Sequence, residues 1–171
     1  MKRITLTSLL LLSTLLEAVN FDTFIGVEAG STELNLQHSD FERGESFGAR
    51  IGFVKNTGRV FINANTTNLD TADLNTFAVN FDAITPSQYR FNDYFALRGF
   101  LGVHGGLAQL KLDNFNDDEG GMGGGQAGVF LDFPYDISLE IGYKATWAAL
   151  DVGVQSVKNY QMIYAAYNYT F

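Results

Sequence analysis

Apolar and polar residues alternate along much of this chain, with the period of two expected for a β-strand whose two faces differ. The clearest case is the end of the sequence, where one face carries Ile163, Ala165, Tyr167, Tyr169 and Phe171. After position 20, glycine, β-branched and aromatic residues recur where a helix would favour Ala, Leu, Glu and Lys. The pattern therefore predicts an all-β fold.

Eight segments alternate in this way. In the segment 94–112 the alternation changes phase near Gly105–Gly106, because the apolar Val103 occupies an odd position and the apolar Leu110 an even one. We interpret this change of phase as a β-bulge. The eight predicted strands cover residues 24–30, 47–54, 59–66, 76–82, 94–112, 126–133, 137–145 and 162–171.

The predicted connections alternate between short and long. Residues 55–58 and 133–136 have the composition of tight turns, whereas 85–93 is longer than a turn requires. Tight turns at one end and longer loops at the other are typical of an outer-membrane barrel, whose sheet must close because hydrocarbon leaves no partner for an open edge. The sequence predicts an eight-stranded antiparallel up-and-down transmembrane β-barrel. The long polar connections are 35–45, 68–73, 113–125 and 148–159.

Aromatic residues gather at the ends of the predicted strands. Two rings of aromatic side chains at the membrane interfaces are a feature of such barrels. We expect one ring at the turn side and a second at the loop side. The turn-side ring comprises Phe21, Phe24, Phe53, Phe81, Tyr94, Phe95, Phe133, Tyr135, Tyr169 and Phe171, and the loop-side ring comprises Phe47, Tyr143, Trp147 and Tyr160.

The first 18 residues have the three-part layout of a secretory signal peptide. Lys2 and Arg3 precede an apolar run, and Ala18 is a small residue suited to the position before cleavage. The run is shorter than the roughly 20 residues of a membrane-spanning helix. The alternative is a buried N-terminal helix of a cytosolic domain. We predict a cleaved signal peptide at 1–18, a barrel domain at 19–171, export through the inner membrane, and residence in the cell outer membrane.

Composition narrows the classes of protein further. The chain has no cysteine, which excludes a disulfide scaffold and a thiolate metal site. Its net charge of −8 has the wrong sign for binding nucleic acid through phosphate contacts. The 46% apolar content excludes a disordered chain. We therefore expect no nucleic-acid partner and no cofactor.

The chain resembles the small outer-membrane β-barrel proteins of Gram-negative bacteria, the eight-stranded OmpA/OmpX-type barrels. The resemblance covers the chain after the leader and is carried by the strand pattern, by the glycine-rich stretch 98–107 and by the C-terminal strand 160–171. It implies that Ile163, Ala165, Tyr167, Tyr169 and Phe171 form the signal read by the barrel-assembly machinery. It also implies contact with outer-membrane lipids and lipopolysaccharide. The sequence ends at Phe171, so we expect no peptidoglycan-binding domain after the barrel.

Charged residues on the polar face of the predicted strands, which would point into the lumen, are candidates for a functional site. Because the lumen of an eight-stranded barrel is only wide enough for side chains, inward charges on different strands can meet. We interpret them as a plug of ion pairs, and the alternative is the constriction of a narrow pore. The predicted lumen cluster consists of Glu28, Arg50, Arg98, Glu140 and Lys144.

The other candidate residues give weaker indications of a metal-binding or catalytic site. The acidic stretch 113–119 lacks the spacing of an EF-hand loop. His38 with Ser39 and Asp40 contains the residue types of a hydrolase, but neighbouring positions seldom converge. His104 is expected to form a hydrogen bond in the lumen. We predict no metal site and a monomer with a non-enzymatic role in envelope structure or surface interaction. The alternatives are a porin-like channel, a lipid A-modifying enzyme and a soluble periplasmic barrel.

Overall fold

The computed structural model of the protein describes residues 21–36, 42–69, 72–86, 89–90, 95–112, 118–152 and 155–171. The predicted signal peptide lies outside these residues. Within them, no helix is long and apolar enough to cross a bilayer. The strands are β1 (Asp22–Leu36), β2 (Glu42–Lys55), β3 (Gly58–Asn68), β4 (Ala72–Ile84), β5 (Tyr89–Arg90), β6 (Ala96–Leu112), β7 (Asp118–Phe133), β8 (Ile137–Val152) and β9 (Gln155–Thr170).

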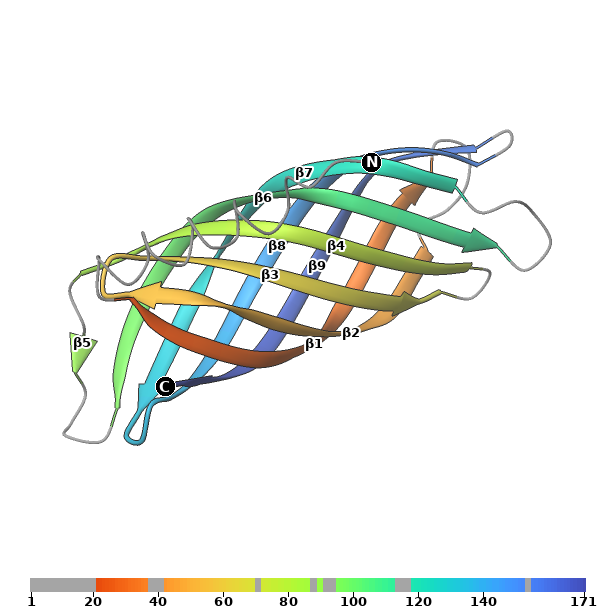
Figure 1. Cartoon of the computed structure of the whole chain (residues 1–171). Helices are drawn as coiled ribbons and strands as arrows, with labels where there is room; N and C mark the ends of the chain where they lie inside the picture. Colours follow the sequence, from red (N-terminus) through yellow and green to blue (C-terminus); the bar gives the residue numbers. More distant parts are fainter. Residues whose placement is uncertain are drawn as a thin grey trace.

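Eight of these strands form a closed antiparallel barrel (Figure 1). Each strand pairs with its neighbour in sequence, β4 pairs with β6, and β1 pairs with β9 to close the ring. The two-residue β5 pairs with the beginning of β6 and is not part of the ring. The predicted all-β, eight-stranded up-and-down fold is confirmed.

The barrel has two unlike ends. The turn end contains the tight turns at Asn56–Thr57 and 134–136 and the ends of the described chain, residues 21 and 171. The opposite end, which we call the loop end, contains the last residues of β1, β3, β6 and β8 and the first residues of β2, β4, β7 and β9. In the β7–β8 turn, Tyr135 and Asp136 have φ angles of 68° and 60°. Positive φ at two successive turn residues matches the twist of the flanking strands and permits this short hairpin.

The ring strands have 11 to 17 residues each and, except for β6, are longer than the sequence predicts. A strand needs only about 9–11 residues to cross a bilayer, so most of these strands exceed the length that a crossing requires. The predicted loops 113–125 and 148–159 are wrong in part, because β7 begins at Asp118 and β8 continues to Val152. Backbone pairing continues there in spite of the many glycines, since alternate glycines face large inward side chains.

The predicted bulge in β6 is wrong. Pairing of β6 with β4 and with β7 runs without a register shift past Gly105 and Gly106. His104, Ala108 and Leu110 all lie on the inward parity and are buried. The hydrophobic pattern changes phase because the inward positions themselves become apolar toward the loop end.

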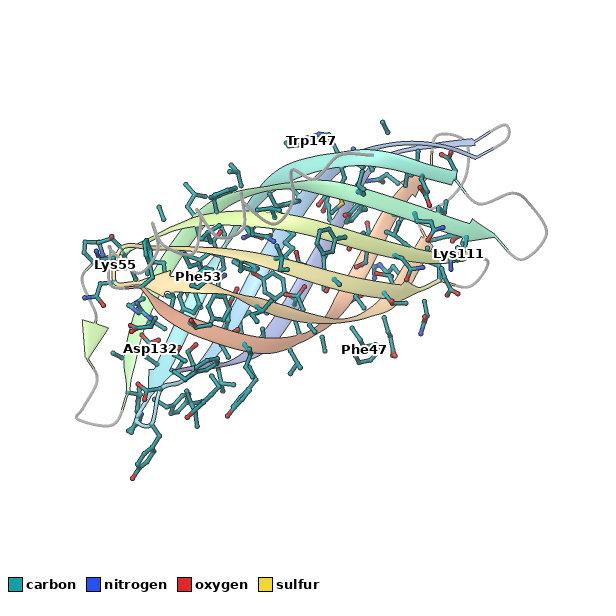
Figure 2. The ribbon with its side chains drawn as sticks, in the orientation of Figure 1. Phe47, Phe53, Lys55, Lys111, Asp132 and Trp147 are labelled. Carbon is teal, nitrogen blue, oxygen red and sulfur yellow. The ribbon has the colours of Figure 1, made fainter. Side chains whose placement is uncertain are left out.

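The outer face is apolar around the barrel. Leu101, Ile163 and Trp147 are 69%, 65% and 64% exposed. Figure 2 shows Phe47 and Trp147 projecting outward from the wall and Lys55 at the turn end. Phe24, which we expected in the turn-side ring, instead lies inside the barrel at 2% exposure and packs edge-on against Phe61. Tyr160, which we expected in the loop-side ring, also lies inside the barrel, at 6% exposure.

Candidate functional site

Charged side chains at the inward-facing positions of the strands lie together in the middle and in the turn half of the lumen. Each side chain of this group is nearly inaccessible, with residue exposures of 1–5%. Inward glycines on neighbouring strands make room for them: a Cβ on Gly102 would overlap Asp82, and one on Gly142 would overlap Tyr164. We define the lumen cluster of the structure as Glu28 (β1), Arg50 (β2), Arg59 (β3), Asp82 (β4), Glu140 and Lys144 (both β8).

Arg50 bridges two carboxylates at the centre of the lumen cluster. Its Nη2 lies 2.9 Å from Glu28 Oε2, and its Nη1 donates to Glu140 Oε2 at 2.9 Å. Lys144 Nζ donates to Glu28 Oε1 at 2.8 Å. These contacts connect β1, β2 and β8 through the interior. The strands β2 and β8 are not neighbours in the sheet, so backbone pairing does not connect them directly.

Arg59 extends the network toward β4 and lies among aromatic rings. Its Nε donates to Asp82 Oδ2 at 2.6 Å, and Nη1 and Nη2 donate to the two oxygens of Glu140 at 2.7 and 2.8 Å. All three guanidinium nitrogens are therefore engaged by carboxylates. Its guanidinium carbon also lies 4.4–5.9 Å from the centroids of four rings, within the range of cation–π attraction. These rings belong to Phe24, Phe61, Phe100 and Phe130.

Neutral side chains add further hydrogen bonds to the buried carboxylates. Asn65 Nδ2 donates to Glu28 Oε1 at 2.7 Å, Tyr164 Oη–H to Glu140 Oε1 at 2.7 Å, and Gln126 Nε2 to Asp82 Oδ1 at 2.6 Å. The cluster itself contains three cations and three anions and is formally neutral. Burial of charge is tolerated when each ion has both a counter-ion and hydrogen bonds, and this cluster meets that condition.

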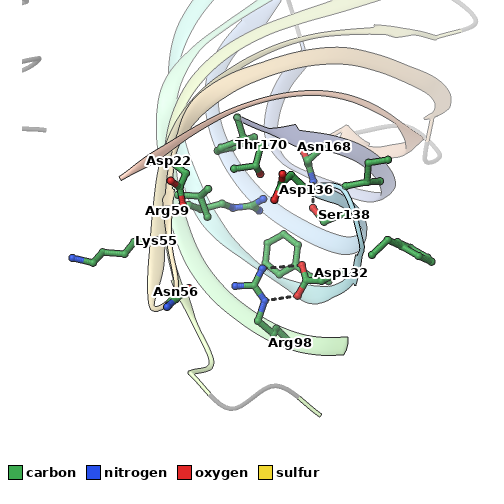
Figure 3. Close-up of a pocket in the computed structure, with 15 residues that line it drawn as sticks. Asp22, Lys55, Asn56, Arg59, Arg98, Asp132, Asp136, Ser138, Asn168 and Thr170 are labelled. Atoms are coloured by element: carbon green, nitrogen blue, oxygen red, sulfur yellow. Dashed lines mark hydrogen bonds and ion pairs between the residues drawn. The ribbon is translucent and has the colours of Figure 1, made fainter. Parts of the chain in front are cut away.

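Arg98 does not join the lumen cluster. Its Nε and Nη2 donate to Asp132 at 2.5 and 2.8 Å, and the two side chains keep 14% and 21% exposure. This pair lines a cavity of about 210 Å³ at the turn end, beside Asp136 and Asn168 (Figure 3). The difference from our expectation has a simple cause: Arg98 is the third residue of β6, so its side chain lies near the mouth and Asp132, near the end of β7, is its neighbour.

Four of the five residues predicted for the plug, namely Glu28, Arg50, Glu140 and Lys144, therefore meet in the lumen. The sequence reasoning missed Arg59 and Asp82. Both occupy inward positions at an end of the predicted strands 59–66 and 76–82. The large inward Phe61 next to Arg59 was the available signal, because an aromatic ring in a narrow lumen needs a partner there.

The remaining sequence candidates are dispersed. His104 Nε2 lies 2.9 Å from Thr146 Oγ1 inside the barrel, and both residues are buried. Asp118 and Glu119 begin β7, whereas Asp113, Asp117 and the group 38–40 lie outside the described residues. In the part of the chain that the structure covers, no group of His, Cys, Asp and Glu is placed to hold a metal ion.

The C-terminal strand presents its predicted apolar face to the outside. Ile163, Tyr167, Tyr169 and Phe171 are 65%, 43%, 43% and 66% exposed, and Ala165 lies on the same face. The backbone of Phe171 exchanges two hydrogen bonds with Thr23, so pairing with β1 extends to the last residue. Whether the assembly machinery recognises this face stays a prediction.

Comparison with known proteins shows that this chain is similar to several of them in fold. No family model matches the chain, and no curated protein sequence is significantly similar. Neisserial surface protein A superimposes with a TM-score of 0.65 at 13% identity, over 87% of this chain and 97% of that one. The attachment invasion locus protein Ail of Yersinia pestis gives 0.48 at 15% identity over 88% and 100% of the two chains. The N-terminal β-barrel domain of Pseudomonas aeruginosa OprF gives 0.48 at 14% identity over 88% and 100%. The chain has the fold of the small outer-membrane barrels.

Proposed function

We propose that the protein is an integral outer-membrane barrel with a structural or surface-interaction role, and that its lumen is closed to solutes. The observation that carries the proposal is the lumen cluster, whose six charged side chains form ion pairs with one another across the interior. An apolar outer face and a closed sheet are what a bilayer requires of a β-protein. The fold shared with Neisserial surface protein A supports the same location.

The buried charges favour closure over conduction. An ion in transit must exchange its hydration shell for groups lining the pore and must also be released. In this lumen the carboxylates and guanidinium groups are already engaged at 2.6–2.9 Å. A passing ion would have to displace them from one another, which costs far more than thermal energy in a water-poor interior.

The expected partners follow from the same placement. Outer-membrane lipids and lipopolysaccharide would contact the apolar outer face, and the barrel-assembly machinery would recognise the C-terminal strand during biogenesis. We further propose export by the signal peptide, a monomeric state, and surface interaction through the connections at the loop end.

A non-enzymatic role is also part of the proposal. The buried His104–Thr146 pair has the atom types of a nucleophile and its base, but exposures of 7% and 2% leave no access for a lipid substrate. Mass spectrometry of lipid A from cells expressing the protein should show no change in acylation. A protein-dependent loss or gain of an acyl chain would refute this part of the proposal.

The test of the main proposal is a pair of measurements on the full chain. Protein from the membrane fraction should run as a compact band in detergent gels when unboiled and shift on boiling. The same protein in planar bilayers should produce no single-channel steps. Recovery in the soluble fraction without a mobility shift would refute the membrane location, and discrete conductance steps would refute closure.

A further inference from the structure

Toward the loop end, beyond the lumen cluster, the interior changes from charged to apolar. One hydrophobic cluster fills this part, and its large members are 1–9% exposed. The hydroxyl of Tyr160 donates a hydrogen bond to Met122 Sδ at 3.0 Å, so its polar group has a partner within the cluster. We call this group the apolar seal: Leu34 (β1), Leu74 (β4), Leu110 (β6), Met122 (β7), Leu150 (β8) and Tyr160 (β9).

The order along the strands places the apolar seal and the lumen cluster at different heights. On β1 the inward positions toward the loop end include Glu28, Thr32 and then Leu34, so the charge and the leucine are about 20 Å apart along the strand. On β8 the corresponding order is Lys144 and then Leu150. Because both strands give the same order, the charged and apolar layers are stacked.

A layer of hydroxyl groups separates the two. Thr32 Oγ1 lies 2.5 Å from Ser46 Oγ, which lies 2.7 Å from Thr67 Oγ1, and all three residues are at most 4% exposed. These hydroxyls hydrogen-bond one another and therefore need no contact with bulk water. Position 32 is therefore accessible to water that has crossed either the lumen cluster or the apolar seal without crossing the other.

We propose that the apolar seal is a second barrier in series with the lumen cluster, which keeps ions out of the lumen even when the ion pairs are broken. A narrow passage lined by leucine side chains excludes water, and an ion entering it would lose hydration with nothing in exchange. The inference rests on the proposed closed lumen and adds to it that closure has two separate causes. It requires that neither layer alone determine conductance.

The test combines conductance with labelling of a cysteine at position 32, since the natural chain has none. The cluster variant carries Arg59→Ala with Glu140→Ala, which removes one cation and one anion. The seal variant carries Leu34→Ser, Leu110→Ser and Leu150→Ser, and its matched control carries Met at the same three positions to keep the layer apolar. Folding of every variant is checked by the heat-dependent gel shift, and Leu110→Ser alone replaces the triple substitution if that does not fold.

In planar bilayers, the cluster variant and the seal variant should each be silent, and only their combination should conduct. In nanodiscs, a small water-soluble thiol reagent should modify Thr32→Cys about tenfold or more faster in either variant than in the parent or the Met control. Conduction by the cluster variant alone would overturn the apolar seal as a barrier. Silence of the combination, or equally fast labelling of the parent, would overturn it too. Conduction by the unsubstituted protein would instead refute the proposed closed lumen itself.

Discussion

Replacing Arg59 by alanine should destabilise the barrel far more than the same replacement at Arg98. Both guanidinium groups are held by carboxylates through close hydrogen bonds, so the two substitutions are chemically matched. They differ in surroundings. The Arg59 side chain is 2% exposed and lies among four phenylalanine rings, whereas that of Arg98 is 14% exposed at the turn end.

The magnitude follows from what each substitution leaves behind. Without Arg59, Asp82 has lost its ionic partner and keeps only Gln126, while Glu140 keeps Arg50. Removing one partner of a buried ion pair costs about 3–5 kcal/mol. Without Arg98, Asp132 is left at a mouth where its 21% exposure admits water, and the cost should approach the 1 kcal/mol or less that is typical of accessible pairs. The loss of stability at Arg59 should therefore be about three times that at Arg98 or more.

The assay is reversible unfolding by urea in detergent micelles, followed by tryptophan fluorescence of Trp147 and by the gel shift. Arg59→Lys serves as an intermediate, because it keeps the charge and loses the fork of hydrogen bonds to Glu140. We expect the free energy of unfolding to decrease in the order Arg98→Ala, Arg59→Lys, Arg59→Ala. Equal losses for Arg59→Ala and Arg98→Ala would show that the lumen cluster contributes no more than a pair at the mouth.

Three further predictions concern the wall of the barrel. Gly102→Ala should cost about 1–3 kcal/mol of stability because the new Cβ overlaps Asp82, whereas Gly121→Ala should be nearly neutral because its Cβ meets nothing within 4 Å; urea unfolding compares them. A cysteine at Ile141 should resist a water-soluble maleimide in nanodiscs, where both ends of the barrel meet the reagent, and one at Tyr135, which is 87% exposed at the turn tip, should react. Free reaction at 141 would contradict a lipid-facing wall. Phe171→Ala should reduce the yield of folded barrel in cells while leaving refolding into micelles unaffected; equal losses in both would assign Phe171 to stability instead of to assembly.

Much of the wall could be predicted from the sequence. Period-two alternation determines which residues face lipid, and the short composition-marked turns determine which strands are neighbours. The ends of strands were less accessible to this reasoning. The glycines of 120–125 have the composition of a loop, yet β7 includes them, because inward glycines there face the side chains of other strands: a Cβ on Gly124 would meet the ring of His104.

Contacts across the lumen could be predicted only in part. Parity gives the set of inward residues, and it placed Glu28, Arg50, Glu140 and Lys144 in one interior. It does not give height, which depends on the stagger of the strands and on where each strand begins. Arg59 and Arg98 illustrate this limit, because they are the second residue of β3 and the third of β6, yet Arg59 reaches Glu140 and Arg98 pairs with Asp132.

The interior of this barrel is best understood as a sequence of layers whose chemistry changes with height. The outer face must be apolar wherever it meets lipid, so it carries little information beyond location. The inner face has no such constraint, and here it passes from an accessible pair at Arg98, through a neutral ionic cluster, to hydroxyls and finally leucines. The hydrophobic alternation therefore changes phase in the loop half of β6 even though the register does not shift, because the inward Ala108 and Leu110 are apolar while the outward positions include Gln109 and Lys111. In a predicted barrel strand, such a change of phase can be a sign of a closed lumen as well as of an irregular backbone.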